Sequence, residues 1–192
     1  PTRRSSDLEG PASARRKGFE KSSGEYISFV DSDDCLDKNF ISNLVFTLES
    51  TNTNICLGRF KIELLIKVKK DLGFKARKLP LKIDVLHQKE YLSALNPCLI
   101  AKLFKREYVD LGNNNYKANE DISIIYSIYT KARYISYCKE AIYHYQLSDD
   151  SQVKKYLYGY KYENLKNTFL PLNTILENFK KYNIYDMYYE SL

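Results

Sequence analysis

Three aspartates, Asp31, Asp33 and Asp34, stand within four positions directly after the apolar segment of residues 26–30. That segment is typical of a short strand, and acids that follow a strand lie at the edge of a sheet, where open α/β sheets bind their ligands. Carboxylates this close repel one another unless a positive charge lies among them. A hard divalent cation, Mg²⁺ or Mn²⁺, meets that need and in turn binds phosphates. The alternative is an acidic turn that caps the next helix.

The residues around these acids extend the pattern. Residues 10–18 read GPASARRKG and residues 24–34 read GEYISFVDSDD. Together they resemble the family 2 glycosyltransferases of the GT-A fold, in which a G-x-x-x-A-R-N-x-G helix precedes a strand that ends in D-x-D-D. Arg16 departs from this pattern, because the family usually has Asn there.

Later segments resemble further motifs of the same family, in the same order. They are residues 101–110 (AKLFKREYVD), 116–132 (YKANEDISIIYSIYTKA) and 141–155 (AIYHYQLSDDSQVKK). Gln146 stands where the last motif usually has Arg. The resemblance therefore spans roughly residues 10 to 155.

The resemblance implies a reaction and its ligands. We expect inverting, metal-dependent transfer of a sugar from a nucleotide-diphosphate donor, a UDP-sugar, to a glycan or lipid-linked acceptor in surface polysaccharide or cell-wall glycan synthesis. A metal that bridges the two phosphates neutralises the charge of the leaving group. In the family, the residues that match Asp31 and Asp33 contact the nucleotide ribose and the metal, and the residue that matches Arg15 contacts the nucleotide.

An acceptor hydroxyl loses its proton as it attacks, and a carboxylate within hydrogen-bond reach can accept that proton. By resemblance, Asp121 is this base and Glu120 orients the acceptor, while Asp34 supports the metal-binding acids. The alternative is that Glu120 and Asp121 only cap the helix that follows them. His144 lies between two tyrosines and is expected to pack or to face the acceptor rather than to bind metal.

Two other classes of function stay open from the sequence. One is a non-catalytic nucleotide- or glycan-binding remnant, which would be expected to have lost Asp33 or Asp121. The other is a metal-dependent nucleotidyltransferase, which also uses paired acids on an α/β sheet. That class predicts a glycine-rich phosphate loop that carries a lysine, and these 192 residues contain no such loop.

The periodicity of apolar residues predicts an α/β fold: a Rossmann-like GT-A sheet that is incomplete at the N-terminus and has a C-terminal helical extension. Helices are predicted at 11–22, from 40 to 48, at 86–95, after 121 and at 153–182. Strands are predicted at 25–30, 54–66, 133–138 and 141–146.

The chain is predicted to have three parts. Residues 1–8 resemble the translation of a sequencing adapter, residues 9–150 are the C-terminal part of a GT-A catalytic domain, and residues 151–192 are the helical extension, itself expected to be cut short. On this interpretation the chain is a fragment that is inactive by itself.

The net charge of +6 is concentrated between residues 59 and 82, where nine Lys or Arg stand against two acids. Such a segment suits an anionic membrane surface or a phosphate-bearing acceptor, or it is an exposed loop. No apolar run is long enough to cross a bilayer. The four cysteines include no C-x-x-C pair, and no nucleic-acid-binding module is recognisable. We expect a cytoplasmic protein with reduced thiols, either free in the cytoplasm or at the inner face of the cell membrane.

Overall fold

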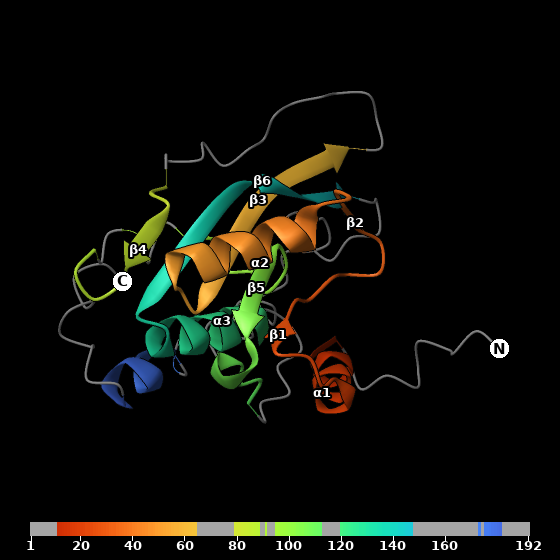
Figure 1. The fold of residues 1–192 in the computed structure, drawn as a ribbon. Coiled ribbons are helices and arrows are strands. Elements are labelled where there is room, and N and C mark those ends of the chain that lie inside the picture. The colour runs from red at the N-terminus through yellow and green to blue at the C-terminus, as the bar shows by residue number, and fades with distance from the viewer. Residues whose placement is uncertain are drawn as a thin grey trace.

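The computed structural model describes residues 11–64, 79–88, 91, 95–112, 120–147, 173 and 175–181. The predictions for residues 1–8, for most of the basic segment 59–82 and for most of the segment 151–192 lie outside these described residues. The named elements are α1 (Pro11–Lys21), β1 (Tyr26–Ile27), β2 (Cys35–Leu36), α2 (Phe40–Thr51), β3 (Ile55–Leu64), β4 (Lys82–Asp84), β5 (Lys102–Lys105), η3 (Arg106–Tyr108), α3 (Glu120–Lys131) and β6 (Tyr134–Leu147) (Figure 1).

One mixed sheet forms the centre of the fold. Its strand order is β1-β5-β3-β6-β2, and β4 also pairs with β6. Strands β3 and β6 run parallel, whereas β5 is antiparallel to both β1 and β3, and β6 is antiparallel to β2 and β4. With helices packed against this sheet, the predicted α/β class is confirmed. Strand β1 lies at one end of this order and precedes the aspartates at residues 31–34 in the chain.

Helices cover both faces of the sheet. Along β3, Ile55 and Leu57 belong to the apolar cluster on the α3 side, whereas Cys56 belongs to the cluster on the α2 side. This alternation follows from the two-residue repeat of a strand. Helix α2 contributes Phe40, Leu44 and Leu48 to its cluster, and residues 175–181 supply Ile175 and Phe179 on the α3 side. The helices predicted at 11–22, at 40–48 and after 121 are confirmed.

Strand β6 corrects one prediction, because the two short strands expected at 133–138 and 141–146 are one strand of 14 residues. Its pairing with β3 shifts register between Gly58 and Arg59, where residues 139–141 bulge out of the ladder. A Cβ at Gly58 would lie 2.9 Å from the Ala141 carbonyl oxygen and 2.9 Å from the Phe40 ring. Only glycine at position 58 of β3 leaves room for Ala141 and Phe40. Strand β6 therefore continues across the bulge and reaches β2.

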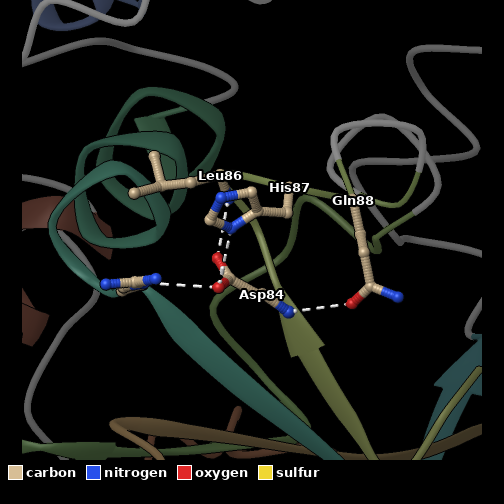
Figure 2. A network of polar contacts seen from close by, with 5 residues as sticks. Asp84, Leu86, His87 and Gln88 are labelled. Carbon is tan, nitrogen blue, oxygen red and sulfur yellow. Dashed lines mark hydrogen bonds and ion pairs between the residues drawn. The ribbon is translucent and has the colours of Figure 1, made fainter.

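The helix predicted at 86–95 is wrong at its start, since β4 ends at Asp84 and residues 85–87 form a turn. Asp84 closes this turn. Its carboxylate accepts a hydrogen bond from the Leu86 amide at 3.1 Å and lies 3.0 Å from His87 Nδ1, while its amide donates to Gln88 at 3.0 Å (Figure 2). Arg133, between α3 and β6, donates to the same carboxylate at 3.3 Å. The carboxylate therefore fixes the turn to the end of α3.

Partial burial of Asp84 opposes ionisation, but the hydrogen bonds from His87, Leu86 and Arg133 outweigh it and lower the pKa of this carboxyl below its usual value. A carboxyl whose pKa is depressed on folding adds stability above the pKa of the unfolded state, near 4, and that stability is lost as the pH falls below it.

We therefore predict that Asp84→Ala lowers the free energy of unfolding by about 1–2 kcal/mol at pH 7. The difference from the unmodified chain should shrink below pH 4. Urea unfolding at several pH values measures both. A difference that stays constant with pH would show that the charge of Asp84 has no part in stability.

In the part of the chain that the structure describes, no helix is long and apolar enough to span a bilayer.

Candidate active site

The three clustered aspartates lie in a turn that directly follows β1. Asp34 N donates to the Asp31 carbonyl oxygen at 3.2 Å, and residues 32–33 form the corner. Asp31 and Asp33 therefore stand at two positions of one tight turn and do not alternate along an extended segment. Two acids of this turn have partners on other elements, because Asp31 pairs with a side chain of α1 and Asp34 bonds to β6. We call residues 31–34 the acidic turn.

Asp34 is used entirely to hold the acidic turn against β6. Its Oδ2 accepts a hydrogen bond from the Tyr143 hydroxyl at 2.6 Å, and its Oδ1 accepts one from the Gln146 amide at 2.8 Å. Burial raises the pKa of the Asp34 carboxyl, although these two hydrogen bonds oppose the shift. The alternative that these acids cap α2 fails for Asp34, because α2 starts after Asn39, which makes no side-chain cap bond.

Tyr143 is the residue that joins the acidic turn to the sheet. Its hydroxyl accepts a hydrogen bond from the Asp31 amide at 3.2 Å and donates to Asp34, so it bridges the two ends of the turn. The ring is fully buried, stacked on Phe60 and edge-on to Phe40. Burial and the neighbouring carboxylate raise the pKa of the Tyr143 hydroxyl, which therefore keeps the proton that it donates.

Arg15 lies on α1 beside the first acid of the turn. Its Nη2 is 3.3 Å from Asp31 Oδ1, and both side chains are partly buried. Pro11 begins the helix, a position that suits proline because its missing amide hydrogen would have no helical partner. The C-terminal end of α1 is held by Arg106, which donates to the Gly24 carbonyl oxygen and to the Ser22 hydroxyl, each at 2.6 Å. Arg106 thereby fixes the helix that carries Arg15.

A cleft of about 530 Å³ separates α1 from β1 and the acidic turn. Arg15, Asp31 and Ser32 line its polar side, and Phe19, Ile27 and Phe29 are among its apolar residues. A cleft with one positively charged side chain, one carboxylate and an apolar wall suits a ligand that has both a flat ring and a charged group.

The carboxylate oxygens of the acidic turn suit a cation that would also bind oxygen atoms of a ligand. Among the described residues, no group of three His, Cys, Asp or Glu side chains converges as a complete metal site. Asp34 is engaged with β6 and Asp31 Oδ1 faces Arg15, so the exposed Asp33 carboxylate and the second Asp31 oxygen are the ligands on offer. Mg²⁺ commonly takes one or two carboxylates and completes its shell with water and phosphate oxygens.

Asp121 belongs to the first turn of α3. The Cys98 thiol is partly buried, and burial raises its pKa, while the charges of Lys102, Asp121, Asp31 and Arg15 also act on it. Asp121 and Asp31 therefore both lie near enough to Cys98 for their charges to act on it. Glu120 begins α3, but its side chain lies outside the described residues, and so does Asn119.

His144 is paired with a carboxylate of its own. Its Nε2 lies 2.8 Å from Asp37 Oδ1, and the β2–β6 register sets Cys35 opposite it. That His144 packs or faces the acceptor rather than binding metal stays a prediction.

Lys102 and Tyr143 are the two residues of this region to which the sequence assigned no role. Lys102 lies in the AKLFKREYVD segment, where lysines usually extend into solvent, yet it is only 2% exposed. Tyr143 is one of 18 tyrosines. Its position two residues before Tyr145 in the last motif was the only available signal.

For the unliganded chain we predict that Tyr143→Phe lowers the free energy of unfolding by about 1–2 kcal/mol, because the Asp34 carboxylate and the Asp31 amide lose their shared partner. Tyr145→Phe, the same change two residues along β6, is the control and should cost less than about 0.5 kcal/mol.

A double-mutant cycle with Asp34→Asn should give a coupling of about 1 kcal/mol by urea unfolding. Additive effects of the two substitutions would contradict a direct Tyr143–Asp34 bond.

Known proteins resemble this chain in sequence and in fold. EpsH of Bacillus subtilis (strain 168), which is named as a glycosyltransferase, is 25% identical over 191 residues, covering 90% of this chain and 54% of EpsH. An uncharacterized glycosyltransferase of Rickettsia bellii (strain RML369-C) is 50% identical over 44 residues, 23% of this chain and 6% of that protein.

Crystal structures of residues 1–349 of S. aureus TarS share the fold. The complex with UDP has a TM-score of 0.57 at 14% identity and covers 89% of this chain and 45% of TarS. The complex with UDP-GlcNAc has a TM-score of 0.58 at 16% identity, with 88% and 47% covered. The chain thus spans about half the length of EpsH and of these TarS structures. The sequence profile of glycosyl transferase family 2 matches residues 2–111, more than half of the chain, and the protein belongs to that family, with a GT-A fold.

Proposed function

We propose that the protein transfers a sugar from a nucleotide-diphosphate donor, a UDP-sugar, to a glycan or lipid-linked acceptor, with inversion at the anomeric carbon, in surface polysaccharide or cell-wall glycan synthesis. The observation that carries this proposal is the arrangement around the acidic turn: Arg15 and Asp31 line one cleft, and Asp33 lies in the same turn as Asp31. Asp121 lies near enough for its charge, like that of Asp31, to act on Cys98. Family membership and the TarS complexes with UDP and UDP-GlcNAc support the class of donor.

The donor diphosphate binds between α1 and the acidic turn. Arg15 supplies a fixed positive charge to the phosphates, and the N-terminal half of α1 adds its helix dipole. The apolar wall of the cleft, formed in part by Phe19 and Ile27, excludes water from one side of the nucleotide. Asp31 and Asp33 would hold a divalent cation beside the phosphates. Bound there, Mg²⁺ or Mn²⁺ would neutralise the charge that develops on the leaving diphosphate.

Asp121 accepts the proton of the acceptor hydroxyl. As the hydroxyl oxygen forms its bond to the anomeric carbon, the bond from that carbon to the diphosphate breaks, and the nucleoside diphosphate leaves on the opposite side. The first turn of a helix is a rigid mount, and a base held within hydrogen-bond reach contributes about 10²- to 10⁴-fold to such a reaction. Glu120, the neighbouring acid in the sequence, orients the acceptor.

A non-catalytic remnant is the weaker alternative, because both Asp33 and Asp121 are present and the turn that carries Asp33 is held by specific hydrogen bonds from Tyr143 and Gln146. Clustered carboxylates repel one another, so holding them in one turn destabilises the fold. A protein that only binds sugar would gain nothing from such a cluster.

The proposal predicts a division of roles between the two acids. In the full-length protein, Asp121→Asn should lower kcat by about 10²-fold or more and leave the affinity for UDP with Mn²⁺ within about twofold. Asn keeps the shape of Asp but does not accept a proton at neutral pH. Asp33→Asn should instead weaken Mn²⁺-dependent UDP binding by about tenfold or more.

Isothermal titration with UDP and Mn²⁺, beside a sugar-transfer assay, separates these effects. Asp110→Asn is a matched control, because Asp110 is an exposed acid that pairs with Lys131 and lies outside the cleft. Normal turnover by Asp121→Asn would reject Asp121 as the base, and metal-independent UDP binding by the unmodified protein would reject the metal site.

A further inference from the structure

Arg106, the first residue of η3, binds the C-terminal turn of α1 with its whole guanidinium group. Besides its bonds to Gly24 and Ser22, its Nη1 donates to the Phe19 carbonyl oxygen at 3.5 Å. The Ser22 hydroxyl donates to the same carbonyl oxygen at 2.7 Å, and the Arg106 amide donates to the Glu25 carbonyl oxygen at 2.9 Å. Because the guanidinium group is planar and its donors have fixed directions, these contacts hold the end of α1 in one arrangement.

The same guanidinium group also lies over the side chain of Phe19. Its Cζ is 4.9 Å from the centroid of the Phe19 ring, a cation–π contact. Among the described residues that line the cleft beside α1, Phe19 is one and Arg106 is not. Arg106 therefore fixes both the backbone and the ring of a residue in the cleft wall from a position outside the cleft.

Helix α1 gives the cleft two different ends. Arg15 and Phe19 both line it, and residues four apart lie on the same face of a helix with about 5–6 Å between their Cβ atoms. At one end Arg15 is 3.3 Å from Asp31 of the acidic turn, and one helical turn further along is the aromatic ring of Phe19. A nucleoside diphosphate has the same order of groups, since its charged diphosphate is joined through a ribose to a flat base.

We propose that the nucleobase of the donor packs against Phe19, and that Arg106 is a positioning residue that holds Phe19 for this contact. The proposal deepens the proposed function, on which it rests, because it divides the cleft into a diphosphate end at Arg15 and a base end at Phe19. Aromatic side chains bind bases through the flat face that every base has. Arg106 thus raises the affinity for the nucleoside part of the donor without touching the donor.

Two probes separate the ends of the cleft. In the full-length protein with Mg²⁺, isothermal titration should show that Arg106→Met weakens UDP binding by about tenfold, because the base loses a fixed aromatic partner. Binding of inorganic pyrophosphate, which has no base, should stay within about twofold. Phe19→Leu should give the same pattern, and the double variant should bind UDP no more weakly than Phe19→Leu, since both substitutions remove one contact.

Lys82→Met is a matched control. Lys82 Nζ also lies over an aromatic ring, 4.4 Å from the centroid of Tyr134, and it donates at 2.9 Å to the carbonyl oxygen of Thr51, the last residue of α2. It has the same kinds of contact as Arg106 but lies outside the cleft. Its substitution should leave the affinities for UDP and for pyrophosphate within about twofold.

A spectroscopic measurement on the unmodified full-length protein does not depend on whether Arg106→Met folds. With ¹³C-labelled phenylalanine rings, the Phe19 resonance, assigned by its loss in Phe19→Leu, should shift when UDP and Mg²⁺ are added and should not shift with pyrophosphate and Mg²⁺. The ring of Phe46, which is 74% exposed on α2 and lies outside the cleft, is the control and should shift with neither.

An Arg106→Met protein that loses the same factor in affinity for UDP and for pyrophosphate would overturn the proposal, because Arg106 would then only stabilise the fold. A Phe19 resonance that UDP leaves unchanged would also overturn it. Either result in a protein that still transfers sugar would reject the base subsite alone. The expected binding pattern in a protein that transfers no sugar would reject the proposed function and leave the base subsite standing.

Discussion

The hydrogen bonds between Asp34 and β6 are the interaction on which the site depends. They fix the acidic turn to the longest strand of the sheet, and through Tyr143 they also hold the amide of Asp31. One acid of the cluster is thus used to place the other two. Because Asp34 takes its partners from Tyr143 and Gln146, Asp33 remains exposed and Asp31 meets Arg15. The division between one acid that holds the turn and two acids that are not bound to β6 follows from these contacts.

The long β6 strand makes this arrangement possible. Its first half pairs with β4, and its second half pairs with β2 directly after the acidic turn. The bulge opposite Gly58 allows the strand to continue past α2 without a clash. The Asp84 turn then anchors Arg133, where α3 passes into β6. The acidic turn and α3, which begins near Asp121, are therefore tied to the two ends of one strand, and packing against the sheet fixes their relative position.

The sequence predicted the parts of the fold that have a strong local pattern. The apolar repeat of Phe40, Leu44 and Leu48 gave α2, and the alternation along residues 55–64 gave β3. It failed at residues 85–87, because the hydrogen bonds of Asp84 decide that turn and one of its partners, Arg133, is distant in sequence. It also divided β6 in two, since the polar Lys139 and Glu140 look like a loop and are in fact a bulge.

The candidate site shows the same limit. Asp31, Asp33, Asp121 and Arg15 were identified because their motifs are local. Lys102 and Tyr143 were missed because their importance lies in burial and in contacts with residues 74 to 112 positions away, which no local pattern reports. The general lesson is that residues that touch a ligand can be read from motifs more readily than residues that place them.

The most direct test of this account is a crystal structure of the complete protein with UDP and Mn²⁺. We expect the diphosphate between Arg15 and the acidic turn, Mn²⁺ bound by Asp33 with or without Asp31, and the Asp34–Tyr143 hydrogen bond unchanged. The Asp121 carboxylate should face the side of the diphosphate where the sugar would lie. A diphosphate bound away from Arg15, or Mn²⁺ bound by Asp34 after release from Tyr143, would contradict the central claim that Asp34 places the acids that bind the donor.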